Sequence, residues 1–264
     1  MNITGRTALI TGATGGIGHA IARRLAREGA SLILTGRRTD VLEPLAAETG
    51  GRVLAVDLAD ADAVQRLAED CAGADILVAN AGVPASGPLL DFSIEEIDRS
   101  LAVNLRAPMV LSRLLGEGMA ARGSGQIVLV SSLSGKFGSP ASSVYSATKF
   151  GLRGFGQGLR GDLRARGVGV SVVFPGFIRD AGMFHESGTH LPSFIGTSTP
   201  EQVADAVSRA IEHDRGELDV APVGVRASVV LGEVAPGVAA TIARRLGGEK
   251  VATDLGANQR ARRT

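Results

Sequence analysis

Cysteine, lysine and the larger aromatic residues are scarce in this chain of 264 residues. It has one cysteine, three lysines, one tyrosine and no tryptophan, against 25 arginines. With Cys71 alone, no disulfide can form within the chain, and nothing argues for an oxidising compartment. Cys71 falls late in a predicted helix, where we expect it to be a small buried apolar residue.

The sequence also lacks the pattern of a targeting or membrane-spanning segment. Its first residues, MNITGRTALITG, have no basic start followed by a long apolar run. The most apolar late stretch, ASVVLGEVAPGVAATIA, is interrupted by Glu233 and Pro236 and is too broken to span a bilayer. We therefore expect a cytoplasmic protein.

Charge of neither sign dominates. The chain has 28 basic and 27 acidic residues, a net charge of +1, which indicates neither nucleic acid nor a membrane as partner. The sequence predicts a small-molecule partner and no metal site. The basic ending, NQRARRT, is interpreted as part of a flexible, solvated tail over 247–264.

Short runs rich in Val, Ile and Leu alternate with longer segments of helical period, which predicts an α/β fold. We expect a Rossmann-type doubly wound parallel sheet of about seven strands, helices on both faces, and a single domain over 1–246. The strands are predicted at 6–11, 31–36, 52–57, 75–80, 126–132, 169–175 and 218–222, and the helices near 16–29, 38–48, 60–72, 93–121 and 143–166, with a further one starting at Ser198–Pro200.

The predicted helix at 143–166 contains an unusual number of glycines, each of which costs about 1 kcal/mol relative to Ala in a helix interior. Three of them share one face, where another backbone could approach closely. This close approach is either tight packing on the chain's own sheet or a contact between subunits. The glycines are Gly151, Gly154, Gly156, Gly158 and Gly161, of which 154, 158 and 161 share the face.

The stretch ALITGATGGIGHAIARRLAREGA predicts a strand, a glycine turn and an amphipathic helix. Gly12, Gly16 and Gly18 allow a tight turn, and the helix start offers free N–H groups to a phosphate, so we predict dinucleotide binding. At the end of the second strand, Gly36 stands where NAD-binding chains have a carboxylate, followed by Arg37 and Arg38. Two guanidinium groups suit a 2′-phosphate, which favours NADP, with NAD possible.

The only tyrosine and one of the three lysines lie four residues apart in YSATK. Residues at this spacing share a helix face, so the Lys149 ammonium is expected beside the Tyr145 hydroxyl. A nearby cation favours the phenolate, so we expect it to lower the pKa of Tyr145 from about 10. Tyr145 is then a candidate general acid/base, and Ser132, at the end of a strand, a candidate donor to the substrate oxygen.

Taken together, these motifs resemble the short-chain dehydrogenase/reductase family over about residues 5–222. The resemblance implies that Asn104, Ser132, Tyr145 and Lys149 are catalytic, with Lys149 also holding the nicotinamide ribose and Asn104 supporting a water chain to solvent. It further implies a homodimer or homotetramer. The expected cofactor-binding residues are Gly12, Thr14, Gly16, Ile17, Gly18, Arg37, Arg38, Asp57, Leu58, Asn80, Ala81, Gly82, Tyr145, Lys149, Pro175 and Gly176.

The segment at about 176–198 lies where this family has its substrate loop. Asp180 stands near where many members have a threonine that binds the carboxamide, which puts that clamp in doubt. Histidines in such a loop, here His185 and His190, are more often solvated than bound to substrate. The apolar residues suit a ketone or secondary alcohol with an apolar body: Phe177, Ile178, Met183, Phe184, Leu191, Phe194 and Ile195.

The expected function is hydride transfer between NADP(H) and a carbonyl or secondary alcohol. Two alternatives remain open at this point. The loop GATGGIG also has the spacing used by nucleotide-sugar epimerases and dehydratases, although only 115 residues follow Lys149. A catalytically silent NADP-binding sensor is the other alternative, although such relatives typically lose the Tyr or the Lys.

Overall fold

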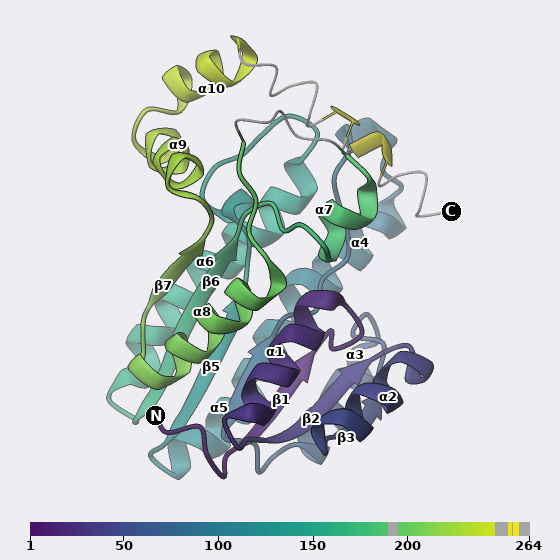
Figure 1. The fold of residues 1–264 in the computed structure, drawn as a ribbon, viewed down its shortest axis with the longest axis vertical. Helices are drawn as coiled ribbons and strands as arrows, with labels where there is room; N and C mark the ends of the chain where they lie inside the picture. Colours follow the sequence, from purple (N-terminus) through teal and green to yellow (C-terminus); the bar gives the residue numbers. More distant parts are fainter. Residues whose placement is uncertain (190–194, 246–252, 255, 259–264) are drawn as a thin grey trace.

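A seven-stranded parallel sheet forms the centre of the molecule (Figure 1). The structure is a computed structural model and describes residues 1–189, 195–245, 253–254 and 256–258. The sheet order is β3-β2-β1-β4-β5-β6-β7, and all seven predicted strands are confirmed. They are β1 Thr7–Thr11, β2 Ser31–Gly36, β3 Arg52–Ala55, β4 Ile76–Ala79, β5 Gly125–Val130, β6 Val168–Pro175 and β7 Glu217–Val220.

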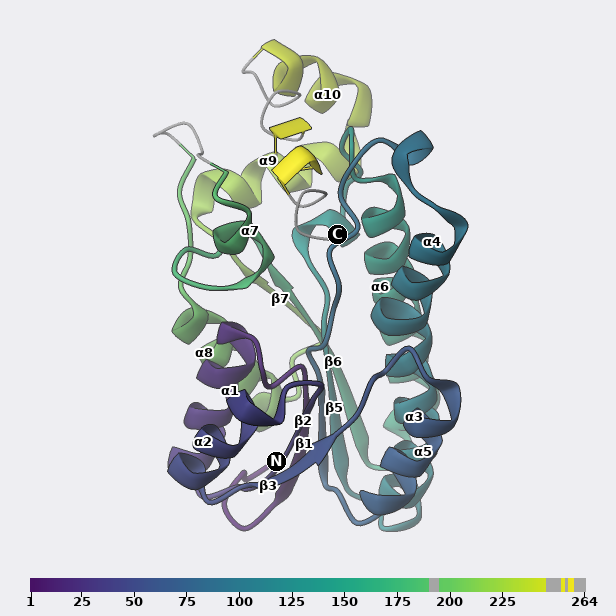
Figure 2. The same ribbon diagram turned by 90° about the vertical axis from the view of Figure 1, so that its right-hand side faces the viewer.

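Two layers of helices bury both faces of this sheet, as Figure 2 shows. Successive side chains of a strand point to opposite faces, so Ile10 joins one core cluster and Leu9 the other. On the Ile10 face lie α1 Gly16–Arg27, α2 Thr39–Thr49 and α8 Pro200–His213. On the Leu9 face lie α3 Ala61–Asp70, α5 Ala107–Ala121 and α6 Ser143–Arg164.

The direction of the chain across the sheet reverses at β1. From β1 the chain moves outward to β2 and β3, then returns to place β4 on the other side of β1. In open α/β sheets, ligands bind beyond the carboxyl ends of the strands at such a point. The fold therefore places the predicted glycine loop, which follows Thr11, at the expected crevice.

The segment predicted as one helix at 93–121 is divided in the structure. Ser93 and Glu96 form a reciprocal capping box that starts α4 Ile94–Leu101, followed by a π-helical turn at Ala102–Arg106 and then α5. Such turns are rare and often occur at functional sites. Helix α8, expected to start at Ser198–Pro200, begins with a second capping box, in which Thr199 and Gln202 bond to each other's backbone N–H groups.

The glycines of α6 face different surroundings. A Cβ on Gly156 would lie 2.5 Å from Val172 of the sheet, so this glycine does allow tight packing on β6. Nothing lies within 4 Å of the Cβ positions of Gly154, Gly158 and Gly161. Packing on the chain's own sheet is therefore the wrong explanation for these three, and a contact between subunits stays a prediction. Cys71 is buried, as expected.

Three helices were not predicted: α7 Gly182–Ser187, α9 Val223–Val234 and α10 Pro236–Arg245. All three lie beyond the carboxyl ends of the strands, above the crevice. No helix in the described part of the chain is long and apolar enough to cross a membrane.

Part of the predicted tail at 247–264 contacts the body of the protein. Gly256 is buried against Gly87, and the Asn258 side-chain amide donates to the Thr189 hydroxyl at 3.2 Å. The prediction for 247–252, 255 and 259–264 lies outside the described residues.

Candidate active site

One cavity of about 1830 Å³ lies at the carboxyl ends of the strands. All of the predicted cofactor-binding residues line it, from Gly12 to Gly176, and so does Ser132. Its far wall comes from α7, α9 and α10. Among the predicted site residues, Asn104 alone does not line the cavity.

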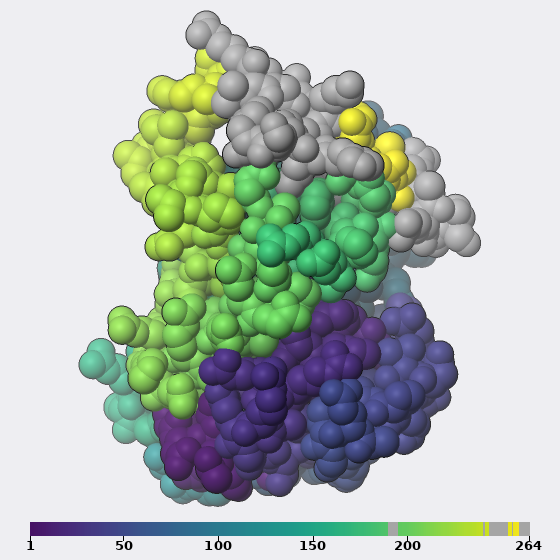
Figure 3. All heavy atoms as spheres, viewed as in Figure 1, coloured from purple at the N-terminus to yellow at the C-terminus, as the bar shows by residue number. Residues whose placement is uncertain are grey.

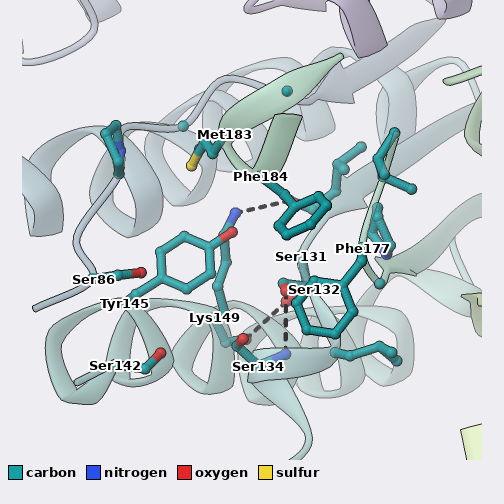
Figure 4. A pocket seen from close by; sticks show the side chains of 18 of the residues that line it. Ser86, Ser131, Ser132, Ser134, Ser142, Tyr145, Lys149, Phe177, Met183 and Phe184 are labelled. Carbon is teal, nitrogen blue, oxygen red and sulfur yellow. Dashed lines mark hydrogen bonds between the residues drawn. The ribbon is translucent and has the colours of Figure 1, made fainter. Parts of the chain in front are cut away.

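Tyr145 and Lys149 share the face of α6 that is turned toward this cavity (Figure 4). The Lys149 Nζ lies 5.6 Å from the centre of the Tyr145 ring and donates a hydrogen bond to the Val130 carbonyl at 3.1 Å. Because Val130 ends β5, the sheet itself fixes the position of the ammonium. The pairing expected from the spacing of four residues is present.

The ionisation of this pair differs from the expectation. Burial raises the pKa of the Tyr145 phenol to about 12, and a hydrogen bond with the Ser132 hydroxyl acts in the opposite direction. Burial lowers the pKa of the Lys149 ammonium to about 8. The prediction of a lowered Tyr145 pKa is therefore wrong for this structure, because loss of water around the phenolate raises the pKa by more than the hydrogen bond with Ser132 lowers it. At neutral pH the phenol keeps its proton.

Ser132 follows the end of β5 and begins a 3₁₀ turn at Leu133–Gly135. Its Oγ accepts a hydrogen bond from the Ser134 backbone N–H at 3.1 Å, which leaves the hydroxyl proton for another acceptor. The neighbouring Ser131 hydroxyl donates to the Lys149 carbonyl at 3.0 Å and so ties β5 to α6. Two serines thus hold the strand end and the tyrosine helix in a fixed relation.

Asn104 lies within the π-helical turn and is fully buried. Its side-chain amide forms two hydrogen bonds with the backbone of Val83. Oδ1 accepts from the Val83 N–H at 2.7 Å, and Nδ2 donates to the Val83 carbonyl at 3.0 Å. It therefore fixes the backbone that follows Gly82, beside Lys149. A role in a water chain stays a prediction.

The glycine loop fits a bound phosphate group. Gly12 has φ +67°, and a Cβ there would lie 2.6 Å from the Ala81 Cα. A Cβ on Gly18 would lie 2.3 Å from the Gly12 carbonyl oxygen. Gly15 precedes the first residue of helix α1 and supplies no side-chain cap, and the first turn of the helix has no acidic residue. Its free N–H groups and positive dipole end thus point into the cavity, where a pyrophosphate suits them.

The end of β2 excludes a carboxylate at the position expected for NAD binding. A Cβ on Gly36 would lie 2.7 Å from the Thr14 Cγ2, so a larger side chain does not fit. Arg38 instead reaches over the loop and donates from Nη2 to the Thr14 carbonyl at 3.0 Å.

Asp57, which also lines the cavity, is held by two donors. Desolvation acts to raise the pKa of its carboxyl, but hydrogen bonds from the Ala59 backbone N–H and from Arg99 outweigh it, so the pKa lies below its usual value. The Arg99 Nη2 lies 3.0 Å from Asp57 Oδ2. The carboxylate is thus fixed in its charged form.

Comparison with known proteins decides the family. The family model described as short chain dehydrogenase matches residues 6–192, more than half of the chain. The chain belongs to the short chain dehydrogenase family.

Its relatives agree in sequence and fold. The dehydrogenase is 38% identical over 227 residues to the ketoacyl reductase HetN of a Nostoc species, covering 83% of this chain and 79% of HetN. A metagenomic short-chain oxidoreductase in complex with NADP has 33% identity and a TM-score of 0.72, covering 84% of this chain and 99% of that one. A short-chain dehydrogenase from Sphingobium yanoikuyae in complex with NADPH has 27% identity and a TM-score of 0.77, covering 88% and 94%.

The substrate loop of the dehydrogenase turns apolar groups into the cavity and Asp180 away from it. The Asp180 side chain is 71% exposed and pairs with Arg179 at 3.4 Å, so it does not take the place of the threonine clamp. Phe177 and Phe184 meet edge to face at 5.1 Å, with Met183 near them (Figure 4). Ile178 and Ile195 also line the cavity. His185 is exposed and does not line the cavity. The predictions for His190, Leu191 and Phe194 lie outside the described residues.

Two parts of the cavity wall of the dehydrogenase were not predicted from the sequence. The first is the inner face of α9 and α10, with Val225, Leu231 and Ile242. The second is Lys136, which is buried, lines the cavity and lies 2.7 Å from Asp219 Oδ1. The scarcity of lysine that drew attention to Lys149 applies equally to Lys136, so a signal was available.

Proposed function

We propose that this dehydrogenase is an NADP-dependent reductase of ketones with a large apolar body, and that it also oxidises the corresponding secondary alcohols. The observation that supports this best is the convergence of the Tyr145 hydroxyl, the Ser132 hydroxyl and the Lys149 ammonium on one cavity that the glycine loop also lines. The bound nicotinamide would supply the hydride.

In this proposal the side chains of the chain position the substrate and move its proton. The Ser132 hydroxyl donates a hydrogen bond to the carbonyl oxygen and stabilises the negative charge that develops there. The Tyr145 phenol, protonated at neutral pH, donates its proton to the same oxygen. Lys149 stands beside the phenolate that remains and offsets its charge.

The size and lining of the cavity support a large substrate. A pocket for one drug-sized ligand usually measures about 300–1,000 Å³, whereas this one measures about 1830 Å³. It therefore has room for a dinucleotide and a second large molecule. Away from the glycine loop much of its wall is apolar, with Phe177, Phe184 and the inner face of α9 and α10.

Arg37 and Arg38 support NADP over NAD, because both line the cavity beside Gly36, where no acidic side chain fits. We also propose a homo-oligomer that uses the open glycine face of α6, next to the exposed ring of Phe150.

The test combines cofactor binding with turnover. Calorimetric titration is expected to give tighter binding of NADPH than of NADH, and a series of 2-ketones of increasing chain length is expected to show kcat/KM rising with length. One NADP⁺ should appear for each ketone consumed, which an epimerase that recycles its hydride would not give. Tight NADPH binding without turnover on any ketone would overturn the proposal in favour of a sensor.

A further inference from the structure

The short turn that begins with Ser132 ends at Lys136. The Gly135 N–H donates to the Ser132 carbonyl at 2.8 Å, and the Lys136 N–H donates to the Leu133 carbonyl at 2.9 Å. The turn also lies close against α6, because a Cβ on Gly135 would be 2.6 Å from the Lys149 carbonyl oxygen. In a 3₁₀ turn these bonds join residues three apart, so a contact that fixes Lys136 also constrains Ser132.

The side chain of Lys136 is anchored on β7. It is 8% exposed, and its Nζ lies 2.7 Å from Asp219 Oδ1 and 3.2 Å from Glu217 Oε2. The same ammonium lies 4.3 Å from the centre of the Phe174 ring, a favourable position for a cation. Lys136 lines the cavity, but two carboxylates already match its charge. It is therefore not a free cation for an acidic substrate.

A second cation joins these groups in one ion-pair cluster, formed by Lys136, Arg153, Glu217, Asp219 and Glu233. Arg153 of α6 pairs with Glu217 at 2.9 Å and also with Glu233 of α9. Strand β7 leads directly into α9 (Figure 1), whose outer side is part of the molecular surface, yellow-green in Figure 3. The ion-pair cluster therefore joins the turn, β7, α9 and the helix that carries Tyr145.

Burial makes the contact between Lys136 and Asp219 hard to break. Their side chains are 8% and 18% exposed, and removing one partner of a buried ion pair leaves an uncompensated charge away from water. The two partners therefore stay together. The end of the turn that carries Lys136 is held in one position relative to β7.

The other end of the turn carries a hydroxyl that has to be placed accurately. Strand β5 ends at Val130, so Ser132 lies beyond the strand and its position depends on the turn. Its hydroxyl forms a hydrogen bond with Tyr145, and in the proposed reaction both hydroxyls meet one substrate oxygen. A displacement of about 1 Å in such a group can cost about 10²-fold in rate.

We propose that Lys136 is a positioning residue for Ser132. Its ion pairs with β7 hold the turn so that the Ser132 hydroxyl stays within reach of the substrate oxygen. The inference rests on the proposed reduction of ketones, in which Ser132 acts on the substrate and Lys136 acts only through Ser132. Loss of the ion pairs should therefore lower turnover without weakening the binding of NADPH.

The experiment is a double-mutant cycle on turnover. Lys136→Met should lower kcat for ketone reduction about 10- to 100-fold, with the Kd for NADPH within about twofold of the parent's. In the Ser132→Ala background the same substitution should change kcat by less than about twofold, since the group that Lys136 positions is gone. An equal loss in both backgrounds would overturn the proposal, because Lys136 would then act independently of Ser132.

A second variant keeps the test decisive if Lys136→Met does not fold. Replacing both partners of a buried ion pair is tolerated better than removing one, so Lys136→Met/Asp219→Asn should melt near the parent's temperature and show the same loss in kcat. Arg160→Met breaks another ion pair of α6, with Asp214, outside the cavity, and should keep the parent's kcat. Full turnover in the folded double variant would overturn the proposal.

A readout without turnover separates failure of this inference from failure of the proposed function. Tyr145 is the only tyrosine, so labelling tyrosine with ¹³C at Cζ gives one NMR signal, which responds to the hydrogen bond with Ser132. Lys136→Met should shift this signal in the same direction as Ser132→Ala, and Arg160→Met should not shift it. If the parent reduces no ketone, the proposed function fails and the signal still decides. An unmoved signal in Lys136→Met would overturn the role of Lys136.

Discussion

The Lys149 ammonium and the Val130 carbonyl form a hydrogen bond of 3.1 Å that joins α6 to the end of β5. The bond holds a buried cation next to Tyr145 before any ligand arrives. Holding it there is costly, since burial lowers the Lys149 pKa to about 8. The stability of the folded protein therefore depends on pH through Lys149.

The first prediction concerns the stability of the cofactor-free protein. Between about pH 8 and 10.5 the unfolded chain binds the Lys149 proton and the folded chain does not, so the free energy of unfolding contributed by Lys149 rises with pH. We expect the parent to gain about 2 kcal/mol relative to Lys149→Met between pH 8 and 9.5. Urea unfolding of both proteins at these two pH values measures the difference in their free energies of unfolding. A difference that does not change with pH would contradict the lowered pKa of Lys149.

The second prediction concerns proton transfer. Tyr145→Phe removes the hydroxyl and keeps the ring, so ketone reduction should fall about 10²- to 10⁴-fold while the Kd for NADPH stays within about twofold. Ser143→Ala removes an exposed hydroxyl from the first turn of the same helix, outside the cavity, and serves as the control. Steady-state kinetics and calorimetry test both, and retained turnover in Tyr145→Phe would exclude it as the acid.

The third prediction concerns the glycine loop. A Cβ on Gly18 would meet backbone atoms of Gly12 and Ala13 at 2.3 and 2.8 Å, so Gly18→Ala should destabilise the fold by about 1–3 kcal/mol and weaken NADPH binding. At Gly15 the nearest atom would be 3.7 Å away, so Gly15→Ala should leave the stability of the fold nearly unchanged. Thermal unfolding with and without NADPH compares the two, and equal melting temperatures would show that the loop is not tightly packed.

The fourth prediction concerns the choice of cofactor. Replacing Arg38 by Ala should weaken NADPH binding about 10- to 100-fold, the value of one or two charged hydrogen bonds, and leave NADH binding nearly unchanged. Arg27→Ala, on the far end of α1, should affect neither. If Arg38→Ala weakens both cofactors equally, its role is to support the Thr14 carbonyl and not to bind a 2′-phosphate.

The fifth prediction concerns the open face of α6. Gly158→Arg should reduce the mass seen by light scattering to that of a smaller assembly, because a long charged side chain would occupy the space left for a second backbone. Gly73→Arg, at another glycine with nothing within 4 Å, should leave the mass unchanged. An unchanged mass in Gly158→Arg would place the contact between subunits elsewhere.

The strands and the main site were predictable because local patterns specify them. Every residue of β5 is buried, so a continuous apolar run was the correct signal for it. Tyr145 and Lys149 need only the helical repeat to share a face. The outer helices were not predictable in the same way, since α9 has apolar residues on both its cavity side and its exposed side and so shows no single apolar stripe.

Long-range contacts decide the remaining features. Lys136 pairs with Asp219, 83 positions later in the chain, and α7 lies against the first turn of α1 at Gly182 and Ile17. The direction of the Tyr145 pKa shift depends on how much water surrounding elements exclude from the phenol. Spacing along a helix contains no information on that exclusion.

The rarity of aromatic residues has a practical consequence for the study of this enzyme. The chain has no tryptophan, and its single tyrosine is the one in the cavity. Its tyrosine emission, and the absorbance change on forming tyrosinate, therefore come from Tyr145 alone. Ligand entry and ionisation can be followed optically at that one group, in the unlabelled protein and without any substitution.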